Sequence, residues 1–208
     1  MLDKYILLFD NALRSICVPP ARVAARSNPA DTHPSIVLSH NEQRLVQGLM
    51  RVNHSGEVCA QALYQGQSLT ARSKNIMQKM QQAALEEIDH LAWCEARLRD
   101  LQSTPSKLNI IWYTMSFILG ACTGRCGDKI SLGFVAETEC QVGEHLAKHI
   151  AMLPAQDQQS CAILQQMQAD EAIHANMAIQ SGGVNLPIFI KKSMRLIARL
   201  MTWTSFYI

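Results

Sequence analysis

The chain contains 208 residues, enough to bury the core of one full domain. Its formal net charge of only +2 argues against a nucleic-acid-binding protein, because such proteins carry a larger and clustered basic surplus. Seven cysteines form no C-x-x-C pair, and residues 1–16 lack the apolar run of a secretory signal. We therefore expect reduced thiols in a cytosolic compartment.

The first part of the chain is predicted to be helical, with one long irregular stretch. Helical patterns cover about residues 2–16 (a short amphipathic helix), 40–72 and 75–101. Residues 17–39 contain several prolines and small polar residues and are predicted to be a linker. Ser103-Thr104-Pro105-Ser106 breaks the last of these helices. We predict an N-terminal helix and linker (1–39) and a main domain (40–208).

The second part shows further helical or apolar segments separated by breakers. These segments are residues 108–122, 128–153, 156–180 and 187–207. The breakers are a predicted turn at Gly124–Gly127, then Pro154, and then Ser181-Gly182-Gly183. No segment shows the alternating, turn-bounded pattern of a β-strand, so the predicted fold class is all-α.

Two Glu-x-x-His pairs occur at residues 87–90 and 171–174, and each has a lone glutamate about thirty positions upstream. Within a pair the two side chains are i,i+3 neighbours on one helix face. Two glutamates from separate helices plus two such pairs form the ligand set of a carboxylate-bridged di-metal centre in a four-helix bundle. The candidate ligands are Glu57, Glu87, His90, Glu139, Glu171 and His174.

The positions of the four glutamates follow the symmetry of two antiparallel helical hairpins. The first two glutamates are centred on Arg72, and the last two are centred on Ala155 beside Pro154. All four therefore lie about 16 residues, roughly 24 Å, from the turn of their hairpin. We expect them to meet at one height in the bundle.

Glutamate and imidazole with open coordination positions suit iron or manganese better than structural zinc. Two ferrous ions with bridging carboxylates can bind and cleave dioxygen, so we expect two iron ions, with dioxygen as co-substrate. Glu87 and Glu171 are the candidate bridges. No Gly-x-Gly-x-x-Gly fingerprint is present, so electrons must come from a bound quinol, from nicotinamide without that motif, or from a partner reductase.

Three further acids flank the candidate ligands. Glu137 lies two positions from Glu139, about 160° around the helix, so both cannot face the metals. Glu86 could pair with His90 at i,i+4, but the equivalent acid in the second motif is Asp170, so the repeat spacing favours Glu87 as the ligand. Alternatively, Glu86 and Asp170 accept the ring N–H of a ligand histidine, or they are simply exposed on the surface.

The remaining histidines and one cysteine pair carry weaker signals. His54 and His145 either lie near the pocket or are ordinary helix residues. Three others are expected to be solvated: His33, His40 and His149. We interpret Cys122-x-x-x-Cys126 as apolar packing rather than as a metal site.

Two apolar segments indicate a membrane surface. Residues 108–122 are too short to span a bilayer and form either a helix buried against the bundle or an interfacial helix. Residues 187–207 interleave aliphatic and aromatic side chains with cations, which suits anionic headgroups and acyl chains. Those cations are Lys191, Lys192, Arg195 and Arg199. We expect an enzyme that works at the membrane surface.

The chain resembles the demethoxyubiquinone hydroxylases, also called 2-polyprenyl-3-methyl-6-methoxy-1,4-benzoquinone monooxygenases. Residues 50–57, MRVNHSGE, are similar to that family's RV(D/N)HAGE, with Ser55 where alanine is usual. The Glu-Glu-Ile-Asp-His and Asp-Glu-Ala-Ile-His elements match as well. The resemblance extends from about residue 40 to the C-terminus, and the N-terminal extension looks like that of the bacterial members.

The resemblance implies a ferritin-like di-iron fold with the six candidate residues as ligands. It implies that a demethoxy polyprenyl quinone ring is hydroxylated with dioxygen, at the penultimate step of ubiquinone biosynthesis. It also implies peripheral attachment to the cytoplasmic face of a bacterial inner membrane, where other ubiquinone-biosynthesis proteins are candidate partners.

Two other functions share the metal motif. A ferritin or rubrerythrin relative would store iron or remove peroxide, but it predicts cage assembly or a rubredoxin-type cysteine module, and the sequence has no such module. A di-iron hydroxylase acting on tRNA would fit poorly with the weak basic excess. Quinone hydroxylation is therefore the preferred prediction.

Overall fold

The computed structural model describes residues 2–17, 19 and 22–208, with the backbone alone for residues 2–5, 7 and 8. Within this part the chain forms seven α-helices, one 3-10 turn and no β-strand. The elements are α1 (Leu2–Ile16), η1 (Pro29–Thr32), α2 (His40–Thr70), α3 (Lys74–Asp100), α4 (Asn109–Cys126), α5 (Asp128–Met152), α6 (Gln158–Gln180) and α7 (Ile188–Tyr207). The all-α prediction is confirmed.

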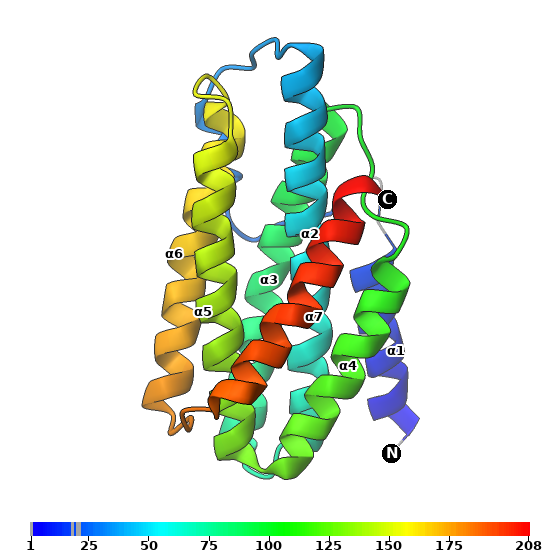
Figure 1. Ribbon diagram of the computed structural model, residues 1–208. Helices are drawn as coiled ribbons and strands as arrows, with labels where there is room; N and C mark the ends of the chain where they lie inside the picture. The colour runs from blue at the N-terminus through cyan, green and yellow to red at the C-terminus, as the bar shows by residue number, and fades with distance from the viewer. Residues whose placement is uncertain (1, 18, 20–21) are drawn as a thin grey trace.

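Four long helices, α2, α3, α5 and α6, form the bundle (Figure 1). Helix α2 begins at a capping box, in which Ser39 and Glu42 each satisfy the backbone N–H of the other. The turn between α2 and α3 includes Arg72, and the turn between α5 and α6 includes Ala155, as the symmetry of the sequence predicts. The architecture is the expected ferritin-like four-helix bundle.

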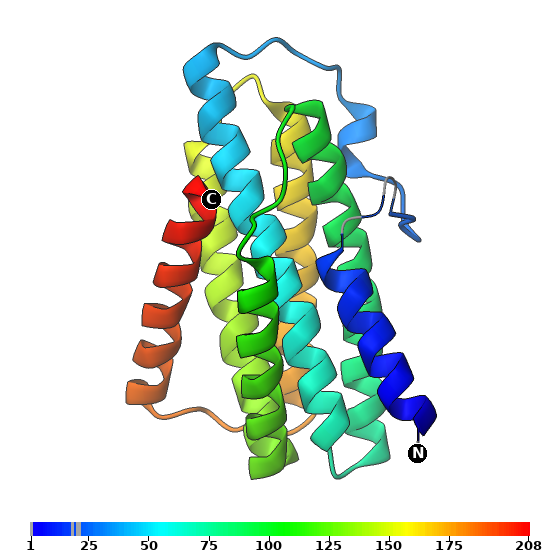
Figure 2. The same ribbon diagram turned by 90° about the vertical axis from the view of Figure 1, so that its right-hand side faces the viewer.

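Helix α4 connects the two hairpins and packs along α2 (Figure 2). Glycines allow this close approach. A Cβ atom at Gly66 would collide with the backbone of Phe117, and one at Gly120 would collide with the backbone of Leu63. Helix α4 ends at Cys126, and the next residue, Gly127, has a φ of 119°, in the region that favours glycine. The next helix, α5, then runs back along the bundle.

Two sequence predictions in this region are wrong. A turn was expected over residues 124–127, but the helix continues to Cys126 and only Gly127 leaves it. Cys122 and Cys126 were expected to pack, yet both are exposed. They lie two positions beyond Gly120 and Gly124, which face α2, and two positions correspond to about 200° around a helix.

The two largest apolar clusters of the core lie on either side of a polar layer. One cluster lies toward the start of α2 and contains Val46, Met50, Trp93, Leu98, Leu146, Ile163, Leu164 and Met167, among others. The other lies toward the α2–α3 turn and contains Tyr64, Met80, Leu132, Val135 and Ala178, among others. The six candidate ligands fall between these clusters along all four helices, in a layer shielded by apolar side chains at both ends.

Helices α1, α4 and α7 lie side by side on one face of the bundle (Figure 2). Helix α4 buries Trp112 and Tyr113 against the bundle, as expected for the buried interpretation of residues 108–122, and exposes much of its opposite side; the interfacial interpretation stays a prediction. Large exposed apolar side chains of these three helices include Ile6, Phe9, Ile110, Ile111, Met115, Ile118, Phe189, Leu196, Leu200 and Trp203. None of the described helices has the length and apolar character needed to cross a membrane.

Residues 22–39 are irregular apart from η1, as predicted for the linker, and residues 18, 20 and 21 of the predicted linker lie outside the described residues. This segment does not extend away from the bundle. Ala30 is buried in the first core cluster, and η1 packs against α6.

Candidate metal centre

Each of the four predicted glutamates projects into the polar layer from a different helix, and the two histidines follow one turn after their glutamates on α3 and α6. None of these six side chains belongs to a residue more than 4% exposed. The structure therefore brings the whole predicted set together, because the equal spacing from the two turns places the four glutamates at one height.

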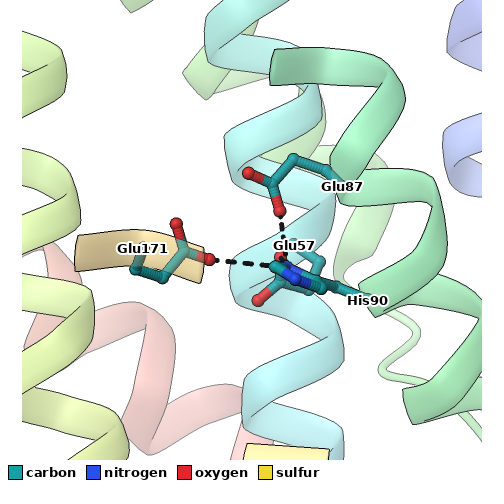
Figure 3. Close-up of side chains that lie close together, drawn as sticks. All are labelled: Glu57, Glu87, His90 and Glu171. Atoms are coloured by element: carbon teal, nitrogen blue, oxygen red, sulfur yellow. Dashed lines mark hydrogen bonds and ion pairs between the residues drawn. The ribbon is translucent and has the colours of Figure 1, made fainter. Parts of the chain in front are cut away.

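His90 lies at the centre of the first half of the site. Its Nδ1 atom is 2.8 Å from Glu87 Oε2, 3.3 Å from Glu57 Oε2 and 3.5 Å from Glu171 Oε1. Figure 3 shows these side chains converging from three helices, and their potential ligand atoms all lie within 4.8 Å of one another. Three carboxylates and one imidazole nitrogen at this separation can surround a single cation.

His174 lies at the centre of the second half. Its Nδ1 atom is 3.2 Å from both Glu87 Oε1 and Glu171 Oε2. Glu139 completes this half and accepts a hydrogen bond of 2.5 Å from the hydroxyl of Tyr64. Glu87 and Glu171 each place one oxygen near either imidazole, which is the arrangement expected of carboxylates that bridge two metals.

The outer nitrogen of each histidine contacts an acid from the opposite motif. His90 Nε2 lies 2.9 Å from Asp170 Oδ2, and His174 Nε2 lies 2.8 Å from Glu86 Oε2. With a metal in place of the Nδ1 proton, an N–H donated outward from Nε2 would leave the Nδ1 lone pair directed into the cluster. The structure thus favours the acceptor role for Glu86 and Asp170, and the pairing of Glu86 with His90 does not occur.

Burial and mutual repulsion dominate the electrostatics of the layer. Burial, together with the neighbouring carboxylates, holds the pKa values of Glu57 and Glu139 well above their usual range. Burial also opposes ionisation of Glu87, but the charge of His90 lowers the pKa of this carboxyl. Despite burial, the carboxylates raise the pKa of His174 to about 12. Protons thus balance the negative charge of the site.

The residues fit two divalent cations. Both oxygens of Glu87 are buried and make no hydrogen bond, although the imidazole nitrogens lie nearby. Buried acceptors without donors are costly, and a cation bound between them would satisfy both oxygens. Four carboxylates would also neutralise two such cations.

Other predicted neighbours lie outside the cluster. Glu137 points to α7 and pairs with Lys191 at 2.7 Å, as expected for a residue on the other face from Glu139. His54 is buried between Glu95 and Asn109, at 3.3 and 3.2 Å, so it joins helices rather than lining the site.

The expectation that His149 is solvated is wrong. His149 faces α2, where it is buried, lies 3.1 Å from Asn53 Oδ1 and packs at 3.8 Å between ring centroids against His145. Burial holds the pKa of His149 at about 3 and that of His145 at about 4. His33 is partly buried and His40 is exposed.

Two contributors to the site are absent from the sequence prediction. Tyr64 lies seven residues after Glu57, a spacing that returns to the same helix face, so this residue could have been found from the sequence. Arg26 contacts Asp170 from an irregular segment 144 positions away, and no local pattern could reveal that contact.

Comparisons with known proteins agree with this geometry. The family model described as "Ubiquinone biosynthesis protein COQ7" matches residues 44–205. The chain is also similar to proteins named 3-demethoxyubiquinol 3-hydroxylase, with 54% identity over 207 residues to that of Legionella pneumophila (strain Paris) and 55% to that of Acinetobacter baylyi. The alignments cover 100% of this chain and 97% of each relative. The chain belongs to the COQ7 family of ubiquinone biosynthesis proteins.

Proposed function

We propose that this protein is a di-iron monooxygenase that hydroxylates the demethoxy polyprenyl quinol ring in ubiquinone biosynthesis. The observation that carries the proposal is the position of Glu87 and Glu171, each with one oxygen near either ligand histidine. The names of the relatives supply the substrate class. Two ferrous ions in this site would bind dioxygen and provide electrons for cleaving it.

The protein's own groups would hold the metals and keep bulk water away from them. The six ligands are buried between two apolar clusters, which limits access of water to the layer. The hydroxyl of Tyr64 donates a hydrogen bond to Glu139 and holds this carboxylate in place. Insertion of one oxygen atom, with the second leaving as water, requires two electrons and two protons from an external reductant.

Two measurements on the purified protein test this assignment. Anaerobic titration should show two ferrous ions bound per chain, and the loaded protein should hydroxylate a demethoxyquinol when dioxygen and a reductant are supplied. Glu171→Ala or His174→Ala should abolish both properties together. The exposed Glu144→Gln is the matched control and should retain both. Full hydroxylation by the His174→Ala variant would refute the proposal. In cells lacking the protein, demethoxyubiquinone should accumulate.

We also propose that the protein is peripheral to the cytoplasmic face of the inner membrane, where a polyprenyl substrate resides. Helices α4 and α7, which lie on one face of the bundle, support this, because they expose apolar side chains such as Ile111, Phe189 and Trp203. Among the described residues, Lys192 and Arg199 of α7 form no ion pair within the chain, and they could meet anionic headgroups.

Flotation with vesicles tests the membrane proposal. The protein should float with vesicles that contain anionic phospholipid, and the double variant Phe189→Ser, Trp203→Ser should float markedly less. Glu144→Gln is again the control. Equal flotation of the double variant and the wild type would exclude α7 as the contact, and a wild-type protein that stays at the bottom of the gradient would refute membrane attachment.

A further inference from the structure

Residues 22–33, called the N-terminal strap here, precede the region that the COQ7 family model matches. The strap is firmly packed onto the bundle. Arg22 forms a salt bridge of 2.8 Å with the buried Glu95, and the carbonyl of His33 accepts a hydrogen bond from Gln159 on α6. Ala30 lies in the apolar core. The strap is therefore a structural part of the bundle, and one of its side chains reaches the metal centre.

Arg26 links the two helices that carry the ligand histidines. Its Nε atom donates to Asp89 Oδ2 on α3 at 2.7 Å, and its Nη1 atom donates to Asp170 Oδ2 on α6 at 2.8 Å. The same oxygen of Asp170 lies 2.9 Å from Nε2 of His90. Arg26, Asp170 and His90 thus form one continuous chain that ends at the inward-facing Nδ1 atom.

Two additional contacts, one to the backbone beside Arg26 and one to the guanidinium itself, restrict the position of this side chain. The backbone N–H of Ala25 donates to the other oxygen of Asp89 at 2.6 Å, so the strap backbone is held directly beside Arg26. The guanidinium lies 4.8 Å from the centre of the Trp93 ring, which is itself 5.4 Å from the ring of His90. A planar donor group held in this way fixes the separation and direction of the two aspartates.

The outer side of the site shows why this restraint matters. A depression of about 190 Å³ beside the strap is lined by Arg26, Glu86, Asp170, Ile173 and His174. The acids that orient both ligand histidines therefore lie near solvent, and without Arg26 the carboxylate of Asp170 could turn toward water. The hydrogen bond that Asp170 accepts from Nε2 of His90 would then no longer fix the orientation of the imidazole ring.

We propose that Arg26 is a positioning residue of the metal centre, which holds Asp170 so that His90 presents its Nδ1 atom to a metal. The proposal rests on the di-metal function proposed above. It assigns to the N-terminal strap a role in assembling a site whose candidate ligands all lie within residues 44–205.

Cobalt(II) binding to the full-length protein tests the proposal without relying on activity. The affinities of the two cobalt ions are measured by competition with a chelator, and the visible absorption of bound cobalt reports ligand geometry. Arg26→Met should weaken one of the two cobalt ions about 10-fold and change its spectrum, because loss of a partner that orients a ligand typically costs 10–100-fold in metal affinity. Arg26→Lys, which keeps the charge but cannot bridge both aspartates, should be intermediate.

Arg14→Met removes an exposed arginine that pairs with Asp10 on its own helix and should match the wild type. All affinities are measured at a temperature where the thermal unfolding curve shows each metal-free variant to be folded. If Arg26→Met binds both cobalt ions with wild-type affinity and spectrum, or only lowers the melting temperature, the strap is merely structural and the proposal is overturned. If the wild type itself binds no cobalt, the proposed di-metal function is refuted, and the role of Arg26 falls with it. If the wild type binds two cobalt ions and only the prediction for Arg26→Met is wrong, the di-metal function stands. If Arg26→Met does not fold, an Arg26→Lys variant identical to wild type overturns the proposal.

Discussion

Replacing Glu57 by glutamine should stabilise the metal-free protein while removing a metal ligand. At an effective dielectric constant of about 20, attraction to the imidazolium of His90 at 3.3 Å contributes about 5 kcal/mol. Repulsion from the charged Glu87 and Glu171, whose oxygens lie within 4.8 Å, costs about 3.5 kcal/mol each. The carboxylate is therefore unfavourable by about 2 kcal/mol, before its desolvation is considered.

Thermal unfolding of the metal-free proteins measures this difference. For a chain of 208 residues, about 2 kcal/mol should raise the melting temperature of Glu57→Gln by about 4–8 °C. Saturating manganese or anaerobic ferrous iron should stabilise the wild type by about 2.7 kcal/mol for each bound ion at a hundredfold excess over Kd, and the variant by much less. Glu144→Gln, on the exposed side of α5, should shift the melting temperature little in either condition.

The direction of the pH dependence provides a second check. Burial and the charge of Glu87 raise the pKa of Glu57 above its usual 4.5, so the folded protein retains a proton that the unfolded chain releases. This contribution to stability is complete below pH 4.5 and is lost as the pH rises through the folded pKa. The advantage of Glu57→Gln should therefore be larger at pH 7.5 than at pH 5. A metal-free variant that melts below the wild type would refute this reasoning.

Three further outcomes are expected. Tyr64→Phe removes the hydrogen bond to buried Glu139 and should cost about 1.5–3 kcal/mol if that carboxyl is ionised, measured by urea unfolding of the metal-loaded protein; an unchanged midpoint would contradict the contact. His149 keeps a folded pKa of about 3, so acidification from pH 7 to 5 should cost about 2 kcal/mol as the unfolded imidazole takes up a proton. The His149→Gln variant should lack this part of the loss. Gly120→Val should lower stability by about 1–3 kcal/mol or more, because its side chain would meet the backbone of Leu63; a tolerated valine would show that α4 can move away from α2.

Much of the candidate site could be predicted because its information is local. The i,i+3 spacing within residues 87–90 and 171–174 determines which side chains share a helix face, and equal distances from two turns determine which faces meet. The predicted turn at residues 124–127 was wrong because Gly124 serves a different purpose. There the missing side chain makes room for Thr70 of α2 within a continuous helix. A glycine needed for packing and a glycine needed for a turn look the same in a sequence.

The sequence by itself determined the all-helical class, the two hairpin turns and the six side chains that converge. These features depend on periodicities that each helix carries alone. Only the tertiary structure decided that Glu86 contacts His174 while Asp170 contacts His90, that His149 is buried, and that Arg26 reaches the site. These contacts join residues that lie between 80 and 144 positions apart, or depend on how one helix is rotated against the next. No short-range pattern records that rotation, because it results from packing all the helices around one core.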